Sequence, residues 1–287
     1  MNHGLIEIDH LLTSVREPDE AGETFQRMGF TVTPRSGVES MGIANRLVLM
    51  TPLQDGTANF IELMGLTEPA RAHPGMKALL AGPEGIRSMV MATLDAHASV
   101  DELRKGGYDA EPAVALQRKW RLPDGSILDV AFDVIMPIPA PLLFNACRYR
   151  TREHYVRPDW LTHRNGAMRM TAVLCCTEDV MSVARYYSRL FGRPEEPIEA
   201  GGRAIRPANV SLEIHEADGL ERRFPGASPR GRRTGYLGYR IAVAGLAHLR
   251  ACLDAGGVSY AEVDGAVTVP ASEAHGNVIV FHQGHRA

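Results

Sequence analysis

Residues 5–15 have the sequence LIEIDHLLTSV, which is typical of a β-strand and carries one histidine, His10, near its middle. Successive side chains of a strand point to opposite faces. Alternation therefore predicts that His10 lies on the same face as Ile8, and that Asp9 and Leu11 lie on the other. A polar Asp-His pair inside an otherwise apolar strand makes this stretch the first candidate for a functional position.

The segments that follow complete a βαβββ unit. A helical period covers residues 19–28 and ends at Gly29, a residue that suits the left-handed backbone of a helix C-terminus. Short apolar runs at residues 30–34, 45–50 and 59–64 then predict three further strands.

The same order of elements recurs three more times, which indicates an internal repeat. The second copy has a strand at 86–93, a helix at 98–105 and strands at 117–122 and 126–133. The third has a strand at 168–177, a helix at 179–191 and a strand at 208–214. The fourth has a strand at 236–244, a helix at 246–255 and strands at 266–269 and 277–282.

These modules divide the chain into two domains. Residues 1–134 form the first domain, with modules at 5–66 and 85–134, and residues 166–287 form the second. The stretch 135–165 is rich in proline and shows no clear period, so we expect an extended linker on the surface.

Composition excludes several classes of protein. The 287 residues are 45% hydrophobic and 23% charged, with a formal net charge of −3, which gives no electrostatic case for a nucleic-acid or anionic-membrane partner. No apolar run is long enough to span a membrane, and no signal-peptide pattern opens the chain. The four cysteines lack metal-binding spacing and are expected to be reduced. We therefore expect a cytoplasmic protein, either a monomer or a homodimer.

Five short motifs carry a resemblance to a known superfamily. They are IDHLL at 8–12, MGF at 28–30, GxxNRL at 42–47, FIEL at 60–63 and the PDG turn at 123–125. Together with the repeats they resemble the vicinal oxygen chelate superfamily, and within it the glyoxalase-like domain proteins. The resemblance implies an α+β fold in which four βαβββ modules form two glyoxalase/dihydroxybiphenyl-dioxygenase-like domains.

The resemblance also implies a site. Two modules curl into a cup, and in metal-using members the first and last strands of each module supply histidine and carboxylate ligands. Matching the modules residue by residue gives His10 and Glu62 from the first, and Ser88 and Asp129 from the second. His10, Glu62 and Asp129 could bind one divalent ion (Mn, Mg, Fe or Zn). The alternative is a metal-free pocket in which the two carboxylates share a proton or pair with Arg46, Arg87, Arg118 or Arg121.

Further residues are candidates for contact with a small-molecule ligand. They are Asn45, Arg46, Ser88, Trp120 and Arg121. Asn45 would orient a ligand carbonyl or cap its own loop, and Trp120 would line the pocket or pack on the sheet.

The functional hypothesis is a protein that binds a small oxygenated metabolite in the first cup. As an enzyme it would be a lyase or isomerase acting next to a carbonyl, with Glu62 or Asp129 as base and His10 as acid or ligand. The main alternative is a non-catalytic binding or sequestration protein of the bleomycin-resistance type, and a third is a scaffold with filled cups. An extradiol dioxygenase is disfavoured, because the strands of the second half lack its two histidines and one carboxylate.

Overall fold

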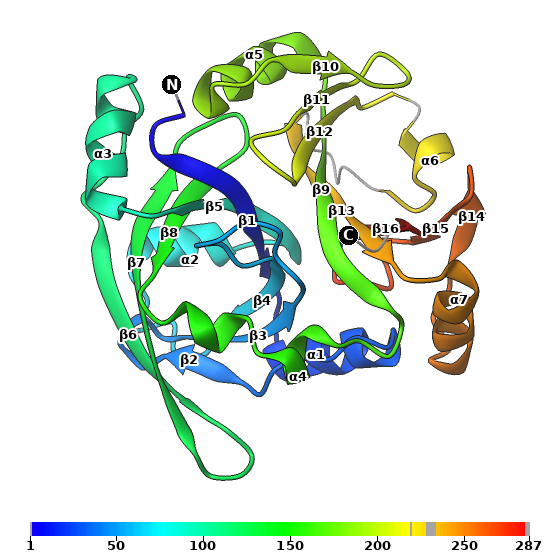
Figure 1. The fold of residues 1–287 in the computed structure, drawn as a ribbon, viewed down its shortest axis with the longest axis horizontal. Helices are drawn as coiled ribbons and strands as arrows, with labels where there is room; N and C mark the ends of the chain where they lie inside the picture. Colours follow the sequence, from blue (N-terminus) through cyan, green and yellow to red (C-terminus); the bar gives the residue numbers. More distant parts are fainter. Residues whose placement is uncertain (1, 219, 228–233, 285–287) are drawn as a thin grey trace.

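The computed structural model describes residues 2–218, 220–227 and 234–284. The described strands form two eight-stranded sheets, which lie on opposite sides of the molecule in Figure 1. The first sheet has the order β2-β3-β4-β1-β5-β8-β7-β6, and the second has the order β10-β11-β12-β9-β13-β16-β15-β14. The two orders are the same when the strands are counted from the start of each half, so the internal repeat is confirmed.

The first half supplies one sheet and the helices around it. Its strands are β1 (Leu5–Ser14), β2 (Ser36–Val38), β3 (Ile43–Leu49), β4 (Phe60–Leu66), β5 (Gly85–Thr93), β6 (Val114–Arg121), β7 (Ile127–Ile138) and β8 (Phe144–Tyr149). Its helices are α1 (Pro18–Arg27), α2 (Pro74–Leu80) and α3 (Ala96–Lys105), with a short 3-10 turn at Glu39–Met41. A second 3-10 turn, Arg152–Tyr155, and α4 (Pro158–Leu161) lead to the second half.

The second half repeats the arrangement. Its strands are β9 (Ala167–Thr177), β10 (Glu195–Pro197), β11 (Arg203–Ile205), β12 (Ser211–Glu216), β13 (Thr234–Val243), β14 (Ala261–Val263), β15 (Ala266–Val269) and β16 (Val278–Gln283). Its helices are α5 (Val180–Phe191), α6 (Leu220–Arg223) and α7 (Leu246–Ala255). The α+β class and the four modules are therefore as expected.

Each module closes with a strand parallel to its first strand, and this corrects the expected linker. In the second module the parallel partner of β5 is β8, whereas β7 pairs only with its neighbours β6 and β8. The stretch 135–165 thus contains the closing strand of the second module. β8 escaped recognition because its first four residues, Phe144 to Cys147, are all buried, so that it shows no alternation.

Two other local expectations were wrong. Residues 30–34 form no strand, and the chain enters the sheet only at β2. In β1, Ile8 does not share the face of His10. Ile8 belongs with Leu11 to the central hydrophobic core, whereas His10 faces a cavity. A bulge in β1, described below, causes this change of face.

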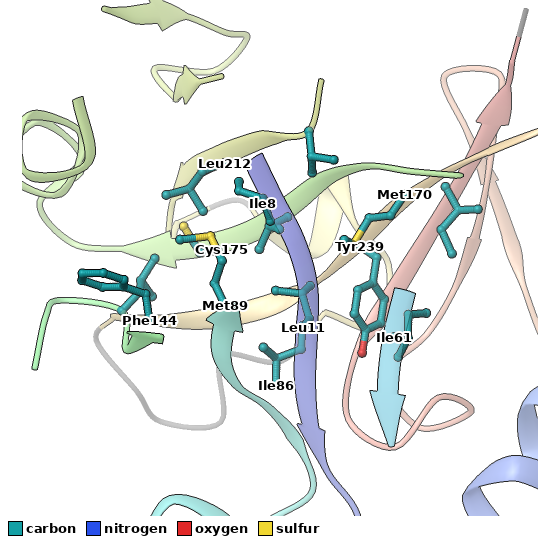
Figure 2. Packing of buried hydrophobic residues seen from close by; sticks show 14 of the residues in the cluster. Ile8, Leu11, Ile61, Ile86, Met89, Phe144, Met170, Cys175, Leu212 and Tyr239 are labelled. Atoms are coloured by element: carbon teal, nitrogen blue, oxygen red, sulfur yellow. The ribbon is translucent and has the colours of Figure 1, made fainter. Parts of the chain in front are cut away.

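One continuous core joins the two halves. Figure 2 shows Ile8, Leu11 and Met89 of the first sheet packed with Met170 and Tyr239 of the second. Polar contacts cross the same boundary. The Thr13 hydroxyl lies 2.6 Å from that of Tyr239. The Glu7 carboxylate accepts hydrogen bonds from the backbone N–H groups of Asn209 and Val210 at 2.6 and 3.2 Å. The two sheets therefore pack as one body through the faces that point away from their cups.

Within the described ranges, none of the helices has the length and apolar character required to cross a membrane.

Candidate functional site

A β-bulge in β1 brings Asp9 and His10 into direct contact although they are neighbours in a strand. Ile8 lies opposite Met91 of β5 and His10 lies opposite Val90, so Asp9 is an extra residue on the β1 side. Such a bulge changes the direction of nearby side chains. As a result, Nδ1 of His10 lies 2.7 Å from Oδ1 of Asp9.

Asp9 is a buried carboxylate surrounded by hydrogen-bond donors. Its Oδ2 accepts from the backbone N–H of Ala58 at 2.6 Å, and its Oδ1 also accepts from the hydroxyl of Tyr149. Burial, and then the charge of Asp9, raise the pKa of Tyr149 well above its usual value, so the phenol remains a donor. The acceptor at Asp9 assigns a proton to Nδ1 of His10 and leaves Nε2 facing the cup.

Glu62 on β4 faces the same imidazole. Its Oε2 lies 3.8 Å from Nε2 of His10. Its Oε1 accepts a hydrogen bond of 2.5 Å from the side-chain amide of Asn45, whose carbonyl accepts from Nη1 of Arg118 at 3.0 Å. Nη2 of Arg118 donates to the hydroxyl of Tyr155 at 3.2 Å. Glu62 is thus held from behind by a chain of side chains, as His10 is held by Asp9.

Arg118 enters this chain from β6 and is enclosed by aromatic rings. Its guanidinium carbon lies 5.2 Å from the ring centroid of Trp120 and 5.9 Å from that of Phe132. Burial raises the pKa of Tyr155 to about 12, so this phenol also stays protonated beside the guanidinium. In the part of the chain that the structure describes, Arg118 forms no ion pair, and its Nε–H is buried without a hydrogen-bond partner.

These polar groups line a cavity in the first cup. The cavity has a volume of about 90 Å³, and its lining includes His10, Asn45, Glu62, Arg118, Asn145 and Tyr149. The lining also includes a group of apolar side chains that pack in one hydrophobic cluster: Leu12, Met41, Ile43, Met64, Met76 and Met136. A mostly apolar hollow with a few convergent polar groups is the usual form of a small-molecule site.

The second module supplies a weaker counterpart of the His10–Glu62 pair. In the first module, Glu62 lies opposite Leu12, which follows His10 by two residues. In the second module, Asn145 lies opposite Val90, which follows Ser88 by two residues. Ser88 and Asn145 are therefore the equivalents of His10 and Glu62. The hydroxyl of Ser88 donates to the side-chain carbonyl of Asn145 at 2.6 Å. Ser88 thus pairs with Asn145 but is fully buried and is not part of the cavity lining, whereas Asn145 lines the cavity and occupies the place that had been assigned to Asp129.

The other expected site residues divide into one that reaches the cavity and four that do not. Asn45 lines the cavity, whereas Asp129 is exposed on β7, which is not the closing strand. Arg46 donates to the backbone carbonyl of Thr33 at 2.9 Å outside the cup. Arg121 is exposed, and Trp120 is fully buried in a second cluster behind Arg118. The expected convergence of His10 and Glu62 with Asp129 was therefore wrong in its third member.

This correction bears on the expected metal ion. The four positions at which the resemblance implies metal ligands hold one imidazole, one carboxylate, one hydroxyl and one amide, from His10, Glu62, Ser88 and Asn145. Among the described residues, no group of three or more histidine, cysteine or acidic side chains could hold a metal ion. The side chains that meet in this cup do not fit a divalent metal site of that kind.

The second cup also contains a carboxylate and a cavity, of about 350 Å³, whose lining includes Glu213, Phe224 and Arg240. Glu213 on β12 matches Glu62 in position and forms an ion pair of 2.9 Å with Arg240. Leu220 and Phe224 pack against the cup-facing residues of β9 and β16. His215 is buried, and the centroid of its ring lies 5.0 Å from the centroid of the Phe224 ring. Because the carboxylate of the second cup is already paired with an arginine, we take the first cup as the stronger candidate.

Four residues of the site were not identified from the sequence. Asp9 was assigned to the opposite face of β1, and Asn145, Tyr149 and Tyr155 lay in the supposed linker. The one available signal was the spacing of Asn145, Cys147 and Tyr149 at every second position, which places them on one face of a strand; all three line the cavity.

Comparisons with known proteins agree with this fold. A hypothetical protein from Staphylococcus aureus superimposes with a TM-score of 0.67 at 11% identity, covering 96% of this chain and 98% of its own. A mutant of 4-hydroxymandelate synthase from Streptomyces coelicolor gives a TM-score of 0.59 at 14% identity, covering 99% and 94%. At such identities the likeness concerns the fold alone. No curated protein matches the sequence.

The family model described as "Glyoxalase-like domain" matches residues 8–191, from the middle of β1 to the end of α5. This match includes the whole first cup and more than half of the chain. It agrees with the motifs around His10 and Glu62 and with the sheet order of both halves. The chain therefore belongs to the glyoxalase-like domain family.

Proposed function

We propose that the first cup binds a small oxygenated metabolite, and that Glu62 and His10 move a proton at a carbon next to its carbonyl group. The observation that supports this most strongly is the geometry of the pair. Nε2 of His10 and Oε2 of Glu62 lie 3.8 Å apart in the lining of one cavity, and each side chain is held by a partner outside the pair. Two positioned acid–base groups that face one reacting atom are what proton transfer requires.

The roles follow from the hydrogen bonds. Oε1 of Glu62 is occupied by Asn45, so Oε2 is the oxygen that takes a proton from carbon. His10 in its protonated form is held at Nδ1 by Asp9 and delivers the proton on Nε2 to the product. Transfer between Oε2 and Nε2, after small side-chain movements, then restores the starting state. This reaction is an isomerisation, and elimination of a neighbouring group would make it a lyase reaction.

The alternative is a protein that binds such a compound without changing it. The apolar lining of the cavity favours this alternative, because binding through the methionine and leucine side chains needs no proton transfer.

Deuterium exchange separates the two functions. A panel of neutral ketones and aldehydes with apolar substituents would be incubated with the protein in D₂O, with binding followed by calorimetry and exchange by ¹H NMR. For ketones that bind, we expect Glu62→Gln and His10→Gln to slow exchange next to the carbonyl at least about 100-fold. Asp129→Asn, an exposed acidic control, and prior treatment with EDTA should leave the rate unchanged. Binding without exchange in the wild type would establish the non-catalytic alternative.

A further inference from the structure

We infer that Arg118 binds the carbonyl oxygen of the ligand and stabilises the enolate that forms there, and that the ligand is a neutral carbonyl compound with an apolar tail. This inference rests on the proposed function. It assigns to a guanidinium the stabilising role that a metal ion plays in metal-using relatives.

Arg118 is suited to this role by its unused hydrogen-bonding capacity. A guanidinium has five N–H donors, and the bonds to Asn45 and Tyr155 use one on each terminal nitrogen. Over the described ranges Arg118 has no carboxylate partner, although it lines the cavity and is only 8% exposed. Each terminal nitrogen therefore keeps one further N–H, and a ligand oxygen in the cavity would accept from these donors.

The charges around the cup favour a neutral ligand. Asp9 and Glu62 place two carboxylates at the cup, against one guanidinium from Arg118. Because burying an unbalanced charge is expensive, a ligand that arrives as an anion would add negative charge beside these two carboxylates. A neutral ketone or aldehyde would not.

The cavity's apolar side chains determine the rest of the ligand. Met41, Met64, Met76 and Met136 line it, and Met64 and Met76 pack in one cluster with Leu12. Methionine side chains adapt to flexible apolar groups. With the carbonyl oxygen at Arg118, an alkyl or aryl tail would extend toward these side chains.

The chemical step keeps the total charge of the cup constant. The C–H bond next to the carbonyl breaks, its proton goes to Oε2 of Glu62, and its electron pair forms the carbon–carbon double bond of the enolate. The negative charge thus moves from Glu62 to the ligand oxygen beside Arg118. Asn45 links these two residues, so the acceptor of the proton and the donor to the oxyanion are held in one hydrogen-bonded unit.

The test uses a compound that ionises to a stable enolate. Nonane-2,4-dione, labelled with ¹³C at both carbonyl carbons, would be added to the full-length protein at neutral pH. The ratio of enolate to neutral dione would be read from the carbonyl shifts of the bound compound. We expect at least a tenfold higher ratio in the wild type than in free solution. In Arg118→Gln the ratio should fall to within twofold of the free value. Arg121→Gln, the same change at an exposed position of the same strand, should behave as the wild type.

Three results would overturn the inference: no binding of the dione to the wild type, no rise in the ratio on binding, or an equal rise in Arg118→Gln. If that variant does not fold, Arg118→Lys keeps the positive charge and should retain most of the rise in the enolate ratio. Loss of this rise in a folded Arg118→Lys would count against charge stabilisation.

Failure of the proposed function can be distinguished from failure of this inference. A raised enolate ratio without deuterium exchange in any ketone would leave Arg118 as an oxyanion site in a binding protein. Exchange that is unaffected in Arg118→Gln would leave the proton transfer and remove this role of Arg118.

Discussion

His163 is a buried histidine whose protonation should control the acid stability of the protein. Its Nδ1 accepts a hydrogen bond from the backbone N–H of Thr31 at 3.0 Å, and its Nε2 donates to the backbone carbonyl of Leu49 at 2.9 Å. Neutral imidazole satisfies both partners, whereas imidazolium would present a second donor to the Thr31 N–H. Burial lowers the pKa of His163 from 6.5 to about 4.

The sign and size of the effect follow from this shift. The unfolded chain takes up the proton near pH 6.5 and the native protein only near pH 4, so the unfolded state binds more protons between these values. The contribution to stability is therefore fully present above pH 6.5 and is lost as the pH falls. The loss is about 2 kcal/mol between pH 7 and pH 5, and about 3 kcal/mol by pH 4.

Urea unfolding of paired variants measures this contribution. Other groups also titrate in this range, so the quantity to follow is the difference in unfolding free energy between the wild type and His163→Gln. Glutamine has an acceptor and a donor but no titration. We expect this difference to change by about 2 kcal/mol in favour of the variant between pH 7 and pH 5. His97→Gln, an exposed control on α3, should show no such change. A constant difference for His163→Gln, or an NMR titration of His163 near pH 6.5, would refute the reasoning.

Three further predictions concern the site and the second sheet. Tyr149→Phe removes a hydrogen bond to the Asp9 carboxylate and should lower the unfolding free energy by about 2 kcal/mol, measured by urea titration; an unchanged value would contradict the buried contact. Gly238→Ala would place its Cβ 1.8 Å from the backbone carbonyl oxygen of Val278. We therefore expect the unfolding free energy to fall by about 3 kcal/mol or more, measured by thermal and urea unfolding. A variant as stable as the wild type would show that β13 and β16 are less close. Burial raises the pKa of Cys147 well above 9, so iodoacetamide at about pH 8 should alkylate it only after denaturation; mass spectrometry of the folded protein tests this, and rapid labelling would contradict it.

The sequence was sufficient where structure depends on local periodicity. The helix expected at residues 246–255 is α7, Leu246–Ala255, because its apolar period and the glycine that follows it are both local signals. The fourfold repeat was also recognised from the sequence, and both sheets have the same strand order. The strand with His10 and the strand with Glu62 were recognised for the same reason.

Recognition failed where a strand carries no alternation. β8 has a fully buried start, Phe144 to Cys147, and follows the prolines of the turn after β7, so it resembled an irregular linker. With β8 missed, the last recognised strand of the module was taken as its closing strand. That error placed the exposed Asp129 in the site and left Asn145 and Tyr149 out of it.

The sequence by itself determined the family, the modules and the two residues that face each other in the first cup. Only the tertiary structure decided what surrounds them. The contact between Asp9 and His10 depends on a bulge that exists because β1 pairs with β5, and the position of Arg118 depends on Asn45, Tyr155 and the rings around it. Periodicity reports which face of an element is apolar, but it contains no information about register between distant strands. Register places one imidazole, two carboxylates and one guanidinium in or beside the same cavity.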